Sequence, residues 1–224
     1  MPLRLILIYL LSCLSDILAY AFNPDAPNYV SAVPPLCLLV FYYSGRKNDY
    51  KLKDYTYSFG LIFASIADLF FEFSGEISQA VALIIYMLSY SFYIATVRHE
   101  AVFGTHWKDL LKVIGNIALI IAPVLIAAPD IDSFFYFASL IYMVFLALLY
   151  VTALMRKTNR SSYIWFLSGA VAFAILTASE VYFMYLNKSV YHIYFQKLFY
   201  LFAQYAIFMG VTKSFKNFYS PNEK

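Results

Sequence analysis

Apolar runs of about 20 residues alternate with short polar segments along this chain. A helix needs about 20 residues, at a rise of about 1.5 Å each, to cross the hydrocarbon core of a bilayer. The segments between the runs, such as NPDAPN at 23–28 and SGRKNDYKLKD at 44–54, are rich in residues that interrupt helices. The pattern predicts eight membrane-spanning helices, at about 3–22, 29–44, 55–73, 78–98, 109–128, 133–154, 162–186 and 190–213.

Two of the predicted helices have an unusual beginning. The first, MPLRLILIYLLSCLSDILAYAF, is similar to a signal peptide. Because Asp16 interrupts its apolar core and it lacks a small-x-small cleavage site, we expect a retained helix. The second contains Pro34-Pro35, and since proline cannot donate a helical backbone hydrogen bond, we expect a kink or a shifted start.

The composition is that of a membrane protein. Hydrophobic residues make up 62% of the chain and charged residues 13%, whereas a soluble domain has about 45–50% and about 25%. The sequence therefore predicts an all-α fold, a polytopic membrane helical bundle, in which residues 1–224 form a single integral membrane domain.

The basic residues predict the orientation of the helices. Of the 16 Lys and Arg residues, 14 fall in segments that the eight-helix pattern places on one side. Because Lys and Arg are enriched in cytoplasmic loops, we expect both termini in the cytoplasm and a bacterial-type inner membrane. The opposite side is acidic, with Asp25, Glu72, Glu76, Asp130 and Asp132.

Several classes of function are disfavoured. The net charge of +3 follows membrane sidedness and does not form the basic patch of a nucleic-acid-binding protein. Cys13 and Cys37 lie inside apolar runs and suggest neither a disulfide framework nor a structural zinc site. His192 is predicted on the opposite side from His99 and His106, which argues against a shared metal site. Because no cofactor-binding motif is present, we expect neither cofactor nor metal.

Three acidic residues lie inside the apolar runs: Asp16, Asp68 and Glu180. A carboxylate at the middle of a spanning helix costs roughly 2.5–3.5 kcal/mol, so such a residue is expected to face a protein interior or a wet cavity. Each acid precedes the outer end of its helix by a similar number of residues, which corresponds to roughly 8–9 Å of depth. The three acids are therefore predicted to share one layer, and Lys197 lies at the same depth and could neutralise one of them.

Two carboxylates in one cavity of low dielectric can carry out acid and base chemistry. Each raises the cost of ionising the other, so one can hold a proton while its neighbour stays ionised. That arrangement suits acetals, glycosides and enol ethers, which react through an oxocarbenium ion. The alternative interpretation stays open, because buried acids also serve as lysine partners or join helices.

Three segments resemble the motifs of the YhhN family of eight-span membrane proteins: GLIFASIADLFF, ILTASEVYFMYL and FYLFAQYAIFMG. The resemblance implies a lysoplasmalogenase, which hydrolyses the vinyl-ether bond of a lysoplasmalogen to a fatty aldehyde and a glycerophospho-alcohol. It places the two acids of the family on Asp68 and Glu180. It places a Tyr-x-x-Ala-Gln segment on Tyr200, Ala203 and Gln204.

The chain departs from the family's pattern at three positions. Ala67 replaces a glycine before Asp68, Glu180 replaces an aspartate, and Tyr90 occupies a position where a histidine is expected, three residues before Tyr93. The step from aspartate to glutamate displaces the carboxyl by about one methylene, and a misplacement of about 1 Å can cost about 100-fold in rate.

The leading hypothesis is therefore a hydrolase whose substrate is a membrane lipid, with Asp68 and Glu180 as the catalytic acid and base. The residues expected to line its pocket or tune the two acids are Asp16, Tyr90, Tyr93, His192, Lys197, Tyr200 and Gln204. The alternative is a non-catalytic membrane subunit that anchors or stabilises a larger membrane complex. A transporter or proton relay is less favoured, because the inner half of the predicted bundle is dry apart from Asn116.

Overall fold

The chain folds into helices, as seen in a computed structural model that describes residues 3–23, 28–46, 50–73, 75–103, 107–127, 133–183 and 192–215. These residues form eight α-helices and two short 3-10 helices, with no β-strand among them. The α-helices are α1 (Leu3–Phe22), α2 (Val33–Gly45), α3 (Leu52–Glu72), α4 (Glu76–Val97), α5 (Trp107–Ala127), α6 (Ser133–Leu154), α7 (Arg160–Val181) and α8 (His192–Thr212), with η1 (Tyr29–Ala32) before α2 and η2 (Arg98–Glu100) after α4. The all-α prediction is thus confirmed.

Within the described residues, four helices are long and apolar enough to cross a membrane. They are Leu3–Phe22, Ile77–Glu100, Tyr136–Leu154 and Arg160–Val181. The structure therefore supports a membrane protein, while the eight spans and the cytoplasmic termini stay predictions. Some of the residues behind the orientation and metal-site predictions lie outside the described residues, namely Asp25, Lys47, His106, Asp130, Asp132, Lys188, Lys216 and Lys224.

The two prolines shift the start of α2. The chain first forms η1, whose N-cap is Asn28, and α2 begins at Val33 with a proline in its first turn. The first N–H groups of a helix have no partner within the helix, so proline costs little there. The prediction of a shifted start at Pro34-Pro35 is therefore confirmed.

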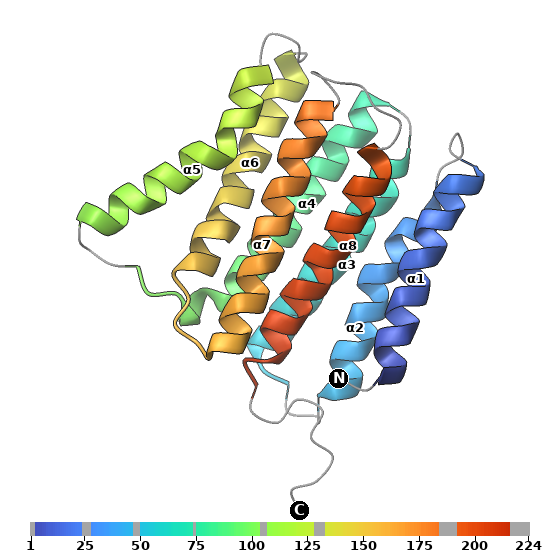
Figure 1. The fold of residues 1–224 in the computed structure, drawn as a ribbon, viewed down its shortest axis with the longest axis horizontal. Helices are drawn as coiled ribbons and strands as arrows, with labels where there is room; N and C mark the ends of the chain where they lie inside the picture. Colours follow the sequence, from blue (N-terminus) through green and yellow to red (C-terminus); the bar gives the residue numbers. More distant parts are fainter. Residues whose placement is uncertain are drawn as a thin grey trace, which may run out of the picture.

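The helices form one bundle (Figure 1). α1 and α2 lie on one flank, α5 and α6 lie on the other, and the remaining four helices lie between them. The first half of α5 leans away from the bundle. α1 begins and α8 ends at the same end of the bundle, which we call the basic end, and we call the opposite end the cavity end.

The contact between α7 and α8 depends on two glycines. A Cβ atom added at Gly169 would lie 2.9 Å from the carbonyl oxygen of Ala203, and one at Gly210 would lie 2.5 Å from the Cβ of Phe166. Only a residue without a side chain allows these backbones to approach so closely. The close approach sets α7 and α8 side by side, and each of them contributes to the site described below.

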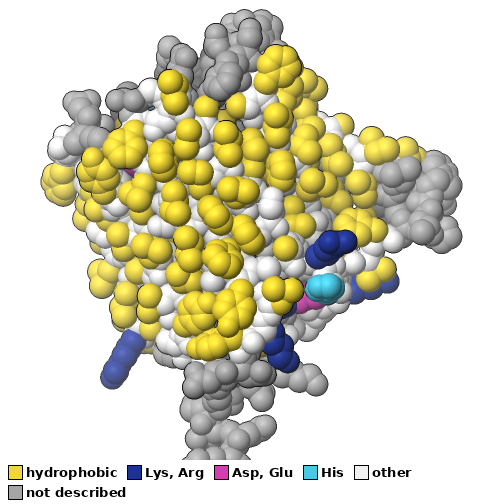
Figure 2. Space-filling view, turned by 180° about the vertical axis from the view of Figure 1, so that it is seen from behind, with side chains coloured by type: hydrophobic (Ala, Val, Ile, Leu, Met, Phe, Trp, Pro, Cys, Tyr) yellow, Lys and Arg dark blue, Asp and Glu magenta, His cyan; other side chains and the backbone are white. Residues whose placement is uncertain are grey.

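Apolar side chains cover much of the molecular surface. Figure 2 shows this on one face, where the Lys and Arg side chains gather in the lower part, toward the basic end. Side chains such as Leu119, which is 72% exposed, and Ile84, which is 54% exposed, lie on the outside of the bundle. A soluble monomer rarely exposes so extended an apolar surface, so this surface is suited to contact with lipid.

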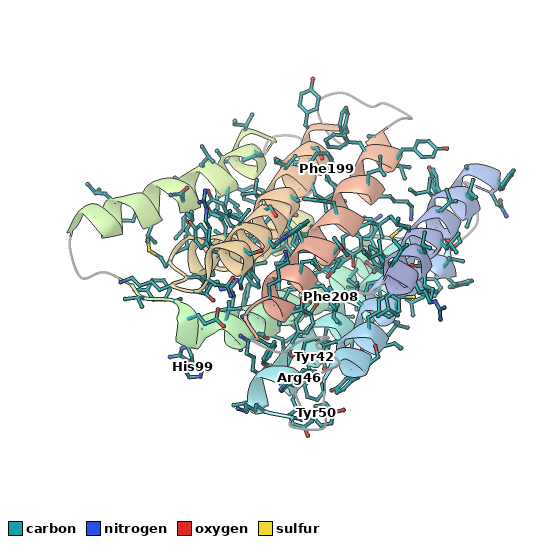
Figure 3. All side chains as sticks on the ribbon, turned by 60° about the horizontal axis from the view of Figure 1, so that its bottom comes forward. Tyr42, Arg46, Tyr50, His99, Phe199 and Phe208 are labelled. Atoms are coloured by element: carbon teal, nitrogen blue, oxygen red, sulfur yellow. The ribbon has the colours of Figure 1, made fainter. Side chains whose placement is uncertain are left out.

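A hydrogen-bonded group closes the basic end around Asp54, in the first turn of α3. Its carboxylate is fully buried and accepts hydrogen bonds from the Tyr42 hydroxyl at 2.6 Å and from the Arg46 guanidinium at 2.9 Å. Tyr42 and Arg46 lie close together in Figure 3, near the end of α2. The group therefore joins α2 to α3.

A second ionic group at the basic end centres on Glu100 in η2. Its carboxylate pairs with the Arg156 guanidinium at 2.5 Å and with the Lys53 ammonium. The same guanidinium donates a hydrogen bond to the Ser162 hydroxyl at 2.9 Å. Glu100 thus links the ends of α3, α4 and α6 to the first turn of α7.

Candidate functional site

A cavity of about 290 Å³ lies at the cavity end of the bundle. Residues of α1, α3, α4, α6, α7 and α8 form its walls, with one residue from η1. Its lining is Asp16, Tyr20, Ser31, Asp68, Phe71, Glu72, Gln79, Leu83, Tyr86, Tyr90, Tyr142, Leu176, Glu180, His192, Ile193, Gln196, Lys197 and Tyr200. The three acids that the sequence places at one depth, Asp16, Asp68 and Glu180, therefore line the same cavity.

Asp68 is held by two tyrosine hydroxyls. Tyr86 of α4 donates a hydrogen bond to one carboxylate oxygen, and Tyr200 of α8 donates to the other at 2.7 Å. Asp68 as a whole is only 5% exposed. Ala64 and Ala67 on the same helix are fully buried and leave space for the neighbouring helices to approach. Asp68 is therefore an acceptor in the cavity wall that two other helices contact through their tyrosines.

Two further polar residues lie behind Tyr200. The Gln204 amide donates to the Tyr200 hydroxyl at 3.1 Å and accepts from the Tyr93 hydroxyl at 2.8 Å. Gln204 is 1% exposed and Tyr93 is fully buried, and neither residue belongs to the described cavity lining. The structure therefore places both predicted pocket residues one layer behind Tyr200, where Gln204 contacts Tyr200 and Tyr93 contacts Gln204.

The same hydrogen bond is a polar contact toward the basic end of the bundle, while the dryness of that half stays a prediction. Tyr93 lies in the last two turns of α4, toward the basic end, and its hydroxyl is hydrogen-bonded inside the bundle. Single tyrosines in an apolar run gave no sign of this, because the partner is on another helix.

Glu180 differs from Asp68 in its surroundings. It lies in the last turn of α7, is partly buried and faces the cavity. Among the described residues, it makes no hydrogen bond or ion pair. Tyr142 lines the same cavity, and its hydroxyl lies 2.9 Å from that of Tyr90 and 3.3 Å from that of Thr177. Glu180 therefore lines the cavity without a described hydrogen-bond partner, unlike Asp68.

Lys197 joins three helices at the rim of the cavity. Its ammonium lies 2.8 Å from a carboxylate oxygen of Asp16 and 3.3 Å from one of Glu72. Asn28 also donates to Asp16, at 2.7 Å, and its backbone N–H donates to Glu72 at 3.2 Å. The acid that Lys197 neutralises is therefore Asp16, together with Glu72, and the interpretation of a buried acid as a lysine partner holds for Asp16.

His192 lies at the start of α8 and lines the cavity, where its ring stacks on Phe183 with 5.9 Å between ring centroids. No group of three or more His, Cys, Asp or Glu that could hold a metal ion occurs within the described ranges. The cavity combines carboxylates, phenols, an imidazole and one ammonium, a set that is suited to moving protons on a bound molecule.

Three residues that shape the site were not predicted from the sequence: Glu72, Tyr86 and Tyr142. Glu72 follows Asp68 by one helical turn, and the spacing of four residues places both on one face of α3. Tyr86 likewise lies four residues before Tyr90, on the same face of α4. The spacing of four residues could therefore have indicated Glu72 and Tyr86 from Asp68 and Tyr90. The sequence has no such pattern that points to Tyr142 on α6.

Comparison with known proteins adds no relative: no family model matches the chain, and neither the curated proteins nor the solved structures provide a match. The resemblance to the YhhN family therefore remains a prediction, carried by the three sequence segments alone.

Proposed function

We propose that this chain is a membrane-embedded hydrolase that cleaves the vinyl-ether bond of a lyso-ether lipid such as a lysoplasmalogen. The observation that carries the proposal is that Asp68 and Glu180 line one cavity in unlike settings. Asp68 accepts hydrogen bonds from two phenols, whereas Glu180 makes none among the described residues. Two carboxyl groups whose environments differ in this way can divide the roles of acid and base.

The settings suggest which group has which role. An ionised carboxylate that is partly buried and has no described partner is costly, so Glu180 is assigned the proton that is given to the substrate. Asp68, which has hydroxyl donors on both oxygens, is assigned the role of base toward water. Tyr86 and Tyr200 hold its carboxylate in one orientation.

The reaction begins when Glu180 transfers its proton to the vinyl carbon that is farther from the ether oxygen. The double-bond electrons form the new C–H bond, and the other carbon becomes part of an oxocarbenium ion. A water molecule adds to that carbon and gives a proton to Asp68, which leaves a hemiacetal. Such an ion needs a nearby negative charge, and the remaining carboxylates supply it.

The hemiacetal then divides into the two products. Glu180 takes the proton of its hydroxyl group, the C–O bond to the glycerol side breaks, and Asp68 returns its proton to the leaving oxygen. One aldehyde and one alcohol leave, one water molecule has been consumed, and both carboxyl groups are in their starting state. No cofactor or metal enters this sequence.

The proposed setting is an eight-span bundle in a bacterial-type inner membrane, with both termini in the cytoplasm. The ionic groups at the basic end support this orientation, since basic residues favour the cytoplasmic side. The cavity then faces the non-cytoplasmic side. At about 290 Å³ it is at the small end of ligand sites, and it suits the glycerol and vinyl-ether portion of a lipid whose chain stays in the bilayer.

The test is aldehyde release from a purified 1-alkenyl lysophospholipid by the protein in detergent micelles or nanodiscs. Asp68→Asn and Glu180→Gln are each expected to lower the rate by about 100-fold to 10,000-fold, the range of general acid and base catalysis. Ser179→Ala is the matched control, because this neighbour of Glu180 donates only to the Leu176 carbonyl, at 2.6 Å, and does not line the described cavity. Thermal unfolding shows that each variant is folded.

Undiminished turnover in either carboxyl variant would refute the assignment of roles. Absence of turnover in the wild-type protein, with every lyso-ether lipid tested, would refute the hydrolase itself.

A second candidate is a non-catalytic membrane subunit that stabilises a larger complex. The ion pairs of Lys197 with Asp16 and Glu72 favour it, because they use part of the polar layer to join helices. Stoichiometric partners that co-purify with the chain, together with no hydrolysis, would support this candidate. An active, monomeric preparation would exclude it.

A further inference from the structure

A row of hydrogen bonds runs from the interior of the bundle to the proposed base, and every donor in it points the same way. Tyr93 donates to the Gln204 carbonyl oxygen at 2.8 Å, and the Gln204 amide nitrogen donates to the Tyr200 hydroxyl at 3.1 Å. Tyr200 then donates to Asp68 at 2.7 Å. Hydrogen bonds in such a row polarise one another, so each donor strengthens the next.

We infer that Gln204 and Tyr93 are positioning residues for Asp68 and that they act through the Tyr200 hydroxyl. The inference rests on the proposed function for its kinetic readout, while its structural readout does not. Neither residue can touch a bound molecule, because Gln204 is 1% exposed, Tyr93 is fully buried and both lie outside the described lining. Any effect they have on the chemistry must pass through Tyr200.

The amide of Gln204 fixes the direction of the row. A hydroxyl can donate or accept, but an amide has a donor end and an acceptor end. With its carbonyl oxygen occupied by the Tyr93 hydroxyl, its NH₂ group faces Tyr200. The Tyr200 oxygen then accepts from Gln204, so its proton is directed at Asp68.

The packing around Tyr93 fixes the position of its ring against α3. A Cβ atom at Gly60 would overlap the ring of Tyr93, so the glycine makes the space in which the ring lies against α3. Ser89 donates to the Gly60 carbonyl at 2.8 Å and joins α3 to α4 at the same level. The Tyr93 hydroxyl is thereby held toward Gln204 on α8.

Asp68 also faces groups that do not belong to the row. Tyr86 donates to it from α4, and Lys197 lies at the rim on α8. The other acids of the cavity are Asp16 on α1, Glu72 on α3 and Glu180 on α7. None of these groups contacts Gln204 or Tyr93 in a described hydrogen bond, so the row can be tested separately from them.

The test depends on the order of the hydrogen bonds, in which Tyr93 reaches Asp68 by way of Gln204 and Tyr200. We compare kcat and KM for aldehyde release in Tyr93→Phe, Gln204→Met and the double variant. Gln204→Met is expected to lower kcat by roughly 5-fold to 10-fold with little change in KM, which is the effect of one hydrogen bond. The double variant is expected to be no slower than Gln204→Met, because Tyr93 acts only through Gln204.

The matched control is Tyr9→Phe. Tyr9 is also a buried tyrosine, and its hydroxyl donates to the Leu201 carbonyl on α8 at 2.7 Å. It lies outside the row and outside the described lining of the cavity. Its removal is expected to change stability without changing kcat.

A second readout needs no activity. Infrared spectra of protein with isotope-labelled aspartate contain the carboxylate bands of Asp68, which are assigned by their loss in Asp68→Asn. These bands report the hydrogen bonds on the carboxylate, and they are expected to shift in Tyr93→Phe and Gln204→Met but not in Tyr9→Phe. If the wild-type protein releases no aldehyde, the proposed function fails while this readout still decides the inference.

Two results would overturn the inference. The first is a double variant whose loss in kcat equals the product of the two single losses, because independent residues would behave in that way. The second is a set of Asp68 bands that is the same in Tyr93→Phe as in the wild-type protein. Tyr93→Phe keeps the ring that packs against Gly60, so it is the variant most certain to fold.

Discussion

Lys197 joins α8 to α1 and α3 at the rim of the cavity, and Lys197→Met removes only its ammonium. The ammonium lies 2.8 Å from Asp16 and 3.3 Å from Glu72. Methionine keeps a stem of similar length, so the packing of the side chain changes little. The substitution leaves two carboxylates at the rim without a cation.

The expected loss can be worked from the exposure of the three side chains. Removing one partner of a buried ion pair costs about 3–5 kcal/mol, since an uncompensated charge stays behind. The side chains of Lys197, Asp16 and Glu72 are 14%, 4% and 18% exposed, so water reaches part of the site. Asn28 still donates to Asp16. We therefore expect a loss of about 2–3 kcal/mol in the free energy of unfolding.

The assay is unfolding of the purified protein in detergent, for Lys197→Met, Asp16→Asn and the double variant. The double variant removes both the cation and the more deeply buried anion of the pair. It is therefore expected to recover much of the stability lost in Lys197→Met, because the uncompensated charge on Asp16 is gone.

Two outcomes would refute this reasoning. One is a Lys197→Met variant as stable as the wild-type protein, which would mean that the ion pairs contribute nothing. The other is strict additivity of the two single losses in the double variant, which would mean that Lys197 and Asp16 do not interact.

Two further predictions concern the packing of the bundle, and thermal unfolding in detergent checks both. Burial lowers the pKa of the Arg156 guanidinium and the charge of Glu100 raises it again, so Glu100→Gln leaves a buried cation and is expected to cost about 2–3 kcal/mol. An equal stability of wild type and variant would contradict the buried pair. Gly169→Ala places a methyl group 2.9 Å from a backbone oxygen of α8 and is expected to cost about 1–3 kcal/mol. Gly115→Ala is its control, because a Cβ atom there meets nothing within 4 Å. This variant is expected to be as stable as the wild-type protein or more stable. A similar loss of stability in both variants would contradict the close approach of α7 and α8.

Part of this structure is local in origin, and the sequence alone determined it. The α-helices follow from apolar runs of a certain length between polar segments, and Pro34-Pro35 move the start of α2 because of a property of proline itself. The place of Asp16, Asp68 and Glu180 toward the same end of the bundle follows from their positions in the second halves of α1, α3 and α7. These features need no knowledge of which helix lies beside which.

The partners of each polar group are not local, and only the tertiary structure decided them. Depth along a helix says nothing about the direction in which a side chain points relative to a distant helix. Thus Lys197 could have neutralised any acid at its depth, and the packing of α8 against α1 and α3 selects Asp16 and Glu72. Gln204 and Tyr93 likewise lie behind Tyr200 because α4 and α8 present those faces to each other.

The different settings of Asp68 and Glu180 arise in the same way. Both are acids inside apolar runs, and the sequence treats them alike. α3 packs where Tyr86 and Tyr200 reach Asp68 from two other helices, whereas no described donor reaches Glu180 on α7. Hydrogen bonds act over about 3 Å, so the relative rotation of neighbouring helices decides which of two similar acids becomes an acceptor and which stays available.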